Sequence, residues 1–178
     1  MKEKRVQKIV LAGGPCCGKS TLIDEIQKRG YSTLGEVARE VLAEGNFGRG
    51  KNYELLQTEI LKRQMQKESE LIEGLHFLDR SAIDGIAYSQ VYLGYLPDSF
   101  QQVDFTGRYE MVFLPDRLPL QKDGVRVESD DSEAERIHYA IKKAYLEQGY
   151  TPIAVPIFPG TFQESISART NFIMEKLK

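Results

Sequence analysis

Residues 9–21 of the chain read IVLAGGPCCGKST. The run KIVLA at 8–12 predicts a short buried strand, and an amphipathic helix follows over about 19–29. Between them, the spacing Gly13-x-x-x-x-Gly18-Lys19-Ser20 matches the phosphate-binding P-loop pattern. Glycines let backbone N–H groups turn inward around phosphate oxygens, and the N-terminus of the following helix adds its positive dipole end. The stretch therefore predicts a nucleotide-binding loop between a strand and a helix.

Each part of this loop has its own expected task. Lys19 is expected to reach the β- and γ-phosphates, and the Ser20 hydroxyl is expected to hold Mg²⁺. The expected nucleotide-binding residues are Gly13, Gly14, Pro15, Cys16, Cys17, Gly18, Lys19, Ser20 and Thr21. The two cysteines of the chain are adjacent, which excludes a disulfide framework. We expect both to be small loop residues, with a redox switch on phosphate binding as the alternative.

Size and composition describe an ordinary globular chain. It has 178 residues, of which 41% are hydrophobic and 28% charged, and we expect one domain over 1–178. The net charge of −2 disfavours a large nucleic-acid surface but leaves a local basic groove open. No apolar run has the length of a membrane span, and no signal-peptide segment follows the charged start MKEKRVQK. A cytoplasmic location is the expectation.

Strand and helix patterns alternate along the chain. Strands are predicted at 8–12, 31–34, 76–81, 109–114 and 153–155, and helices at 19–29, 36–42, 53–73, 82–93, 133–148 and from about 161 onward. Gly74 is expected to end the third helix, while Ser132 and Thr161 are expected to open capping boxes. The alternation predicts an α/β fold of the three-layer P-loop NTPase type, with a five-stranded parallel sheet, helices on both faces and a ligand at the carboxyl edge.

The rest of the chain narrows the kind of P-loop protein. A GTPase needs a guanine-reading Asn-Lys-x-Asp segment after a strand, and the sequence has none. Ring-forming ATPases carry a separate helical lid and are longer. Small-molecule kinases of the nucleoside and nucleotide type fit the length, and they need acids at strand ends and an arginine-rich flap.

Phosphoryl transfer depends on positioning and on charge neutralisation, which assigns roles to three residues after the strands. Glu36 is the candidate base for the acceptor hydroxyl, with Arg39 one turn later on the same face. Asp79 is the candidate magnesium partner, and Arg80 is the candidate phosphate contact. Glu36 and Arg39 as a solvated ion pair, and Asp79 as a helix cap, are the structural alternatives.

A polar stretch at 116–136 has the character of a lid over phosphates. It contains Arg117, Arg126 and Arg136, and the Asp123-Gly124 turn makes Arg126 the best candidate to reach the transferred phosphoryl group. A solvated loop of mixed charge is the alternative.

Three tyrosines and the two histidines are not assigned to the catalytic, nucleotide-binding or metal-binding residues. Tyr88, Tyr92 and Tyr95 either flank a ring-shaped acceptor or pack in the core. His76 and His138 have no partners at metal-ligand spacing, so we expect structural roles for both.

Taken together, these residues and motifs resemble those of one family. It is the AAA-like P-loop ATPase and kinase family related to the nicotinamide riboside kinase domain of the bacterial NAD-biosynthesis regulator. The resemblance rests on GGPCCGKST, on Glu36-x-x-Arg39-Glu40, on LDRS at 78–81 and on KDGVR at 122–126. The segment FLDRS also resembles the Asp/Glu-Arg-Ser motif of deoxynucleoside and thymidylate kinases. These likenesses imply a parallel kinase core with ATP and Mg²⁺ as donor, and they leave the acceptor open.

The sequence thus predicts a kinase that transfers the γ-phosphoryl group of ATP to a hydroxyl of a small nucleoside-like acceptor. Its expected catalytic residues are Lys19, Glu36, Asp79, Arg80 and Arg126, and its expected metal ligands are Ser20 and Asp79. The alternative is a nucleotide-dependent switch or slow NTPase that acts through a protein or nucleic-acid partner, with 45–51 and 116–136 as switch segments. A polynucleotide kinase is a variant of the first prediction.

Overall fold

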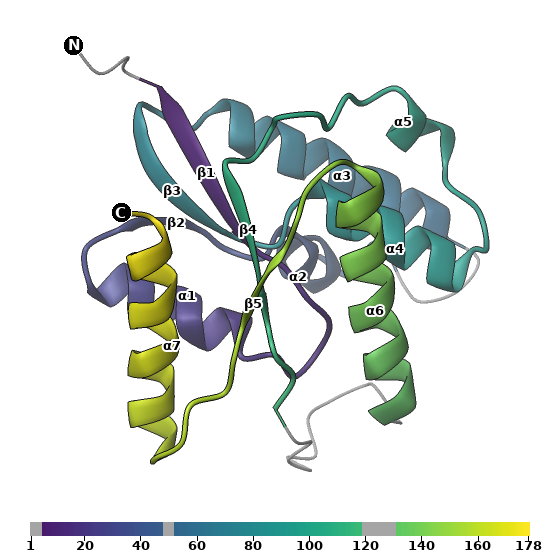
Figure 1. Ribbon diagram of the computed structural model, residues 1–178. Helices are drawn as coiled ribbons and strands as arrows, with labels where there is room; N and C mark the ends of the chain where they lie inside the picture. Colours follow the sequence, from purple (N-terminus) through teal and green to yellow (C-terminus); the bar gives the residue numbers. More distant parts are fainter. Residues whose placement is uncertain (1–4, 48–51, 119–130) are drawn as a thin grey trace.

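The computed structural model describes residues 5–47, 52–118 and 131–178 (Figure 1). Within these ranges, five strands form one parallel sheet in the order β2-β3-β1-β4-β5. The strands are β1 (Val6–Leu11), β2 (Ser32–Leu34), β3 (Gly74–Asp79), β4 (Met111–Pro115) and β5 (Ile153–Val155). The predicted parallel α/β fold is confirmed.

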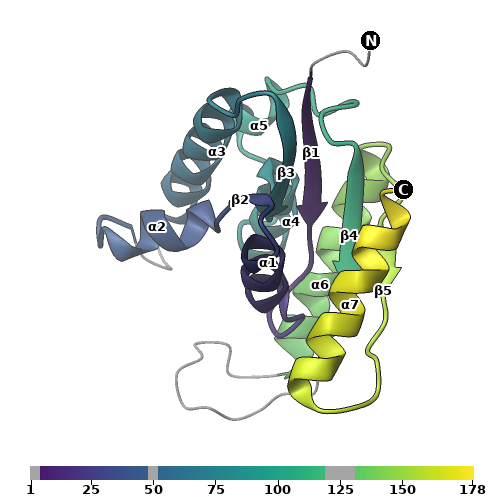
Figure 2. The same ribbon diagram turned by 90° about the vertical axis from the view of Figure 1, so that its left-hand side faces the viewer.

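Helices cover both faces of the sheet. One face carries α1 (Lys19–Lys28) and α7 (Phe162–Lys176), and the other carries α3 (Tyr53–Ser69), α4 (Ala82–Tyr92) and α6 (Asp131–Glu147) (Figure 1). The short helix α2 (Val37–Ala43) packs beside α3, as Figure 2 shows, and α5 (Asp98–Gln101) follows α4. None of the helices in the described ranges is both long and apolar enough to span a membrane.

The side-chain alternation of the central strands explains why both faces are covered. In β1, Ile9 and Leu11 enter the cluster under α1 and α7, whereas Val10 enters the cluster under α3, α4 and α6. In β4, Phe113 likewise faces the first cluster and Val112 the second. Successive side chains of a strand point to opposite faces, so a strand that is apolar throughout must be buried on both.

The predicted helix over 53–73 is too long. The helix α3 ends at Ser69, and Ile72 beyond it is 77% exposed. Gly74 does not end the helix but begins β3, in the left-handed region at φ 136° and paired with Val6 of β1. The apolar spacing of Leu71 and Ile72 therefore reflects no helical face, because the chain has already turned toward the sheet.

The two predicted capping boxes have different outcomes. Thr161 caps α7 as expected, because its Oγ1 accepts from Glu164 N at 3.3 Å and Glu164 Oε2 accepts from Thr161 N at 2.7 Å. The helix α6 already includes Asp131, so Ser132 lies inside the helix and the prediction of Ser132 as its N-cap is wrong. The prediction of a single domain over 1–178 stays a prediction.

Candidate active site

The loop between β1 and α1 lies at the carboxyl edge of the parallel sheet, as predicted. Gly13, Cys16 and Gly18 adopt the left-handed backbone region, with φ of 123°, 64° and 76°. Gly14 is required for another reason, since a Cβ there would lie 2.9 Å from the backbone nitrogen of His138. The loop is therefore curled tightly and packs directly on α6.

Hydrogen bonds from other groups hold the carbonyls of this loop. These bonds include Arg80 Nη1 to Gly13 O at 3.1 Å, Lys19 Nζ to Gly14 O at 2.7 Å, Leu118 N to Cys16 O at 2.8 Å and Arg169 Nη1 to Cys17 O at 3.1 Å. In a trans peptide the N–H points away from the C=O of the same unit. The N–H groups of Cys17 and Gly18 therefore point away from Leu118 and Arg169, toward the interior of the loop. Such inward N–H groups form an anion-binding cradle.

Lys19 lies folded over this cradle and is only 6% exposed. Burial lowers the pKa of its ammonium group, and the nearby Arg80 lowers it further. Both effects disfavour the charged ammonium group, which forms no ion pair within residues 5–47, 52–118 and 131–178, so a bound phosphate would relieve them.

Ser20 and Asp79 form a pair beside the loop. Ser20 Oγ donates to Asp79 Oδ2 at 2.9 Å, and Asp79 Oδ1 is buried with no hydrogen-bond partner among the described residues. Burial raises the pKa of Asp79, while Lys19 opposes that rise. An unpaired carboxylate oxygen next to a hydroxyl fits the oxygen ligands that Mg²⁺ takes in nucleotide sites. The residues expected to hold the metal ion are thus adjacent.

Asp79 does not cap the following helix. Ser81 is the N-cap of α4, and Asp84 completes its capping box. A buried network fixes this turn, because Tyr145 of α6 donates to Asp84 Oδ2 at 2.6 Å and lies 2.6 Å from Ser81 Oγ. The alternative interpretation of Asp79 as a helix cap is wrong, and the network with Tyr145 was not foreseen.

Glu36 and Arg80 connect the second strand to the loop. Arg80 Nε donates to Glu36 Oε1 at 3.0 Å, and its Nη1 lies 3.4 Å from Asp84 Oδ1. Burial alone would raise the pKa of Glu36, but Arg80 and Lys19 outweigh burial, so the net pKa lies below its usual range. Arg80 itself has φ 75°. This left-handed conformation is strained for a residue other than glycine, and strained residues of this kind cluster at functional sites.

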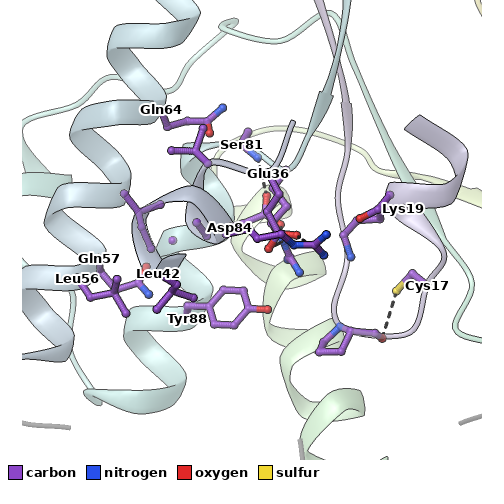
Figure 3. Close-up of a pocket in the computed structure, with 18 of the residues that line it drawn as sticks. Cys17, Lys19, Glu36, Leu42, Leu56, Gln57, Gln64, Ser81, Asp84 and Tyr88 are labelled. Carbon is purple, nitrogen blue, oxygen red and sulfur yellow. Dashed lines mark hydrogen bonds and ion pairs between the residues drawn. The ribbon is translucent and has the colours of Figure 1, made fainter. Parts of the chain in front are cut away.

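A cavity of about 560 Å³ separates the loop from the helices α2, α3 and α4. In Figure 3, Cys17 and Lys19 of the loop region face Leu56 and Gln57 of α3, with Glu36 between them. The wall away from the loop is mostly apolar and aromatic, and it includes Leu42, Tyr53, Leu56, Ile60, Tyr88 and Tyr92. The cavity therefore has a charged end at the loop and a largely apolar end at the helices.

Gln57 is one of the polar residues in that wall. It is 4% exposed and lines the cavity, and no described residue forms a hydrogen bond with its carboxamide. Gly85 of α4 lies close to this side chain and leaves room for the neighbouring Phe100, since a Cβ there would lie 2.8 Å from Phe100 and 3.4 Å from Gln57 Oε1. The sequence pattern placed Gln57 on a helix but carried no signal that its side chain would line the cavity.

The remaining predicted site residues divide into three groups. Tyr88 and Tyr92 line the cavity, whereas Tyr95 is exposed and donates to Glu54, so it does not contribute. Arg39 pairs with Glu36 at 3.5 Å, although its side chain is 74% exposed. Arg126 and positions 119–130 of the expected lid lie outside the described residues.

Arg117 and Arg136 are the other arginines of the stretch at 116–136. Arg117 pairs with Asp131 at the start of α6, and Arg136 is exposed on that helix. Neither lines the cavity.

Two residues against the loop were missed as neighbours of the site. His138 Nδ1 lies 3.4 Å from Gly14 N and 3.2 Å from Cys17 Sγ, which joins α6 to the loop. Arg169 of α7 reaches the loop from the other side. A sequence signal existed for Arg169, because it lies between Ile166 and Ile173 on the apolar stripe of its helix.

Comparison with known proteins identifies the fold. A family model described as an AAA domain matches residues 8–164. The solved structure of NadR protein in complex with NR superposes with a TM-score of 0.69 at 17% identity over 97% of this chain, and this chain spans about half (50%) of that one. No curated protein matches the sequence.

Two shorter structures match over nearly their whole length. Deoxyadenosine kinase from M. mycoides has a TM-score of 0.65 at 18% identity, over 96% of this chain and 98% of that one. Thymidylate kinase from Ehrlichia chaffeensis has a TM-score of 0.60 at 13% identity, over 97% and 99%. The architecture is therefore that of the P-loop kinases.

Proposed function

Because the chain belongs to the AAA domain family and has the fold of P-loop kinases, we propose that it transfers the γ-phosphoryl group of ATP to a hydroxyl group of a nucleoside-like acceptor. One observation carries this proposal. Arg80 donates both to Glu36 Oε1 and to the Gly13 carbonyl, so the candidate base and the phosphate-binding loop face one cavity. A phosphoryl donor and an acceptor hydroxyl bound there would meet between them.

The donor half of the site consists of the loop and the start of α1. The inward N–H groups of the loop and Lys19 would bind the phosphates, whose charge they neutralise. Ser20 and Asp79 would hold Mg²⁺, which supplies charge neutralisation at the phosphate oxygens when it is bound. The unpaired Oδ1 of Asp79 supports this assignment.

The acceptor half depends on Glu36. Its lowered pKa keeps the carboxylate ionised at neutral pH, as an acceptor for the proton of the attacking hydroxyl requires. Arg80 holds this carboxylate in place and adds positive charge where the phosphoryl group would pass. We propose from the sequence motif alone that Arg126 contacts the transferred phosphoryl group, since Arg126 lies outside the described residues.

The cavity wall supports an uncharged, flat acceptor. Tyr88 and Tyr92 stack with ring centroids 6.2 Å apart, and Gln57 lines the same cavity with a carboxamide that no described residue engages in a hydrogen bond. Of the cations on the described wall, Arg39 and Arg80 already pair with Glu36, and Lys19 belongs to the loop. A nucleoside ring with an amide edge suits this wall better than an acceptor that brings its own phosphate.

A transfer assay with γ-labelled ATP tests the proposal. We expect label on nucleosides when purified protein, Mg²⁺ and a panel of nucleosides, nucleotides and RNA ends are incubated together. Label on RNA ends alone would identify a polynucleotide kinase. Release of inorganic phosphate without transfer to any acceptor would overturn the kinase proposal and favour the nucleotide-dependent switch.

A further inference from the structure

Arg169 is a charged side chain with no exposed surface, on the face of α7 that packs against the sheet. Its Nη1 donates to the Cys17 carbonyl at 3.1 Å. Its Nη2 donates to the carbonyls of Asp116 at 2.9 Å and Val155 at 3.3 Å. One guanidinium thus joins the phosphate-binding loop to the ends of β4 and β5.

The charge of this guanidinium is not balanced by an ion pair among the described residues. Its acceptors there are neutral backbone carbonyls, and its Nε is buried without a hydrogen-bond partner. Burying a cation without a paired anion is costly, whereas a neutral amide could satisfy a carbonyl at a lower cost. Bridging carbonyls therefore does not by itself explain why the buried group is a cation.

The position of the guanidinium suggests what its charge acts on. A Cβ built on Gly18 would lie 3.4 Å from Arg169 Nη1, so the cation contacts the residue that precedes α1. The helix α1 has no side-chain hydrogen bond at its N-cap, which leaves N–H groups of its first turn available for a ligand. The cation therefore lies behind a helix end that is already partly positive.

The hydrogen bond to Cys17 also has a geometric effect. Because the carbonyl of Cys17 points to Arg169, the N–H of the next residue, Gly18, points the opposite way. That direction is into the loop, where an anion would bind. Without the guanidinium, the Cys17–Gly18 peptide would lose the partner that sets its orientation.

We infer that Arg169 is a positioning residue for the nucleotide phosphates. It directs the Gly18 N–H into the phosphate-binding loop, and its buried charge strengthens the attraction of the loop for anions. The inference rests on the donor half of the proposed function, which is nucleotide binding, and it does not depend on the acceptor.

Binding of inorganic tripolyphosphate, measured by titration calorimetry on the full chain, tests this role without the adenine ring or the acceptor. We expect Arg169→Gln to weaken tripolyphosphate binding about 10- to 100-fold, as for the loss of hydrogen bonds from a charged group. Arg169→Lys keeps the charge but loses the fork, so its binding should fall between wild type and Arg169→Gln.

Arg29→Gln is the matched control. Arg29 also joins α1 to α7, through a 2.7 Å hydrogen bond from its Nη1 to Asn171 Oδ1, but its side chain bonds to no loop residue among those that the structure describes. We expect this variant to bind tripolyphosphate as the wild type does. A merely structural role for Arg169 would lower the unfolding temperature and leave the tripolyphosphate Kd of the folded variant unchanged, which would overturn the inference.

The possible failures can be told apart. A wild-type protein that does not bind tripolyphosphate contradicts the nucleotide binding of the proposed function as well. If wild type binds and neither Arg169 variant folds, NMR of the ¹⁵N-labelled wild-type protein decides the matter. Tripolyphosphate should then shift the Gly18 amide and the Arg169 guanidinium signals, with the Arg29 signal unmoved, and an unshifted Arg169 signal would overturn the inference.

Discussion

The guanidinium of Arg80 donates to Glu36 Oε1 at 3.0 Å across a separation of 44 positions in the chain. The same guanidinium donates to the Gly13 carbonyl at 3.1 Å and lies 5.4 Å from the ring centre of Tyr88. A change on the acceptor side of the cavity can therefore reach the loop through one side chain. Both members of the ion pair are mostly buried, so the loss of either one leaves an unpaired charge.

Glu36→Gln should lower kcat by roughly 10²-fold or more, because the amide cannot take the proton of the acceptor hydroxyl. The KM for ATP should change little, because the amide oxygen of the variant can still accept from Arg80 Nε and so leave Arg80 on the Gly13 carbonyl. Steady-state kinetics with a nucleoside acceptor measure both values. Glu40→Gln is the control, because Glu40 lies in the helix that Glu36 precedes, is exposed and pairs with Lys67. Normal turnover by Glu36→Gln would exclude Glu36 as the base.

Asp79→Asn should make ATP binding nearly independent of Mg²⁺. The amide keeps the shape of the side chain but loses the negative charge, which we expect to weaken the metal contribution roughly 10- to 100-fold. Calorimetry with ATP, in the presence of Mg²⁺ and of a chelator, gives the ratio of the two dissociation constants. Asp24→Asn, on the exposed side of α1, should keep the wild-type ratio. An unchanged ratio in Asp79→Asn would remove Asp79 from the metal site.

Gly14→Ala should destabilise the protein by about 1–3 kcal/mol, as overpacking typically does. The new Cβ would meet the backbone nitrogen of His138 at 2.9 Å and the carbonyl oxygen of Ala134 at 3.0 Å, and backbone atoms of a helix cannot move aside independently. Urea denaturation measures the free energy of unfolding. At Gly35 a Cβ would find nothing within 4 Å, so Gly35→Ala provides the comparison. Equal stabilities of the two variants would contradict the close packing of α6 on the loop.

His138 predicts a loss of stability in mild acid. Burial, together with Lys19 and Arg117, lowers the pKa of His138 to about 4 from an ordinary value of 6.5. At pH values between about 4 and 6.5, His138 therefore binds a proton more readily in the unfolded chain than in the folded protein. Its contribution to the free energy of unfolding is fully present above about pH 6.5 and falls as the pH drops toward 4.

His138→Gln isolates this contribution. Urea denaturation at several pH values between 7 and 4 should show a shallower decline for the variant than for the wild type. Parallel declines in the two proteins would mean that His138 is not held neutral against the loop.

Much of the fold could be predicted because its signals are local. The P-loop spacing, the apolar strands and most helix ends depend on residues within a few positions of one another. The errors occurred where local signals mislead. Leu71 and Ile72 continue an apolar spacing that no helix uses, and Ser132 resembles an N-cap although the helix begins before it.

The candidate site divides in the same way. Lys19 and Ser20 could be predicted from the P-loop spacing. Glu36, Asp79 and Arg80 could be predicted because they lie at or just after the ends of parallel strands, and the carboxyl ends of such strands meet at one edge. Gln57 could not be found, because a glutamine on a helix has no distinctive neighbours in sequence. Its role depends on the cavity that α2, α3 and α4 enclose.

The sequence by itself determined that a phosphate-binding loop lies between a strand and a helix, and that strands and helices alternate around it. Only the tertiary structure decided which distant side chains hold that loop. Arg169 is 152 positions from Cys17, and His138 is 124 positions from Gly14. The physical reason is that periodicity reports the burial of one element along its own length. Contacts between elements depend on the sheet order β2-β3-β1-β4-β5 and on the packing of helices against it, which no local pattern encodes.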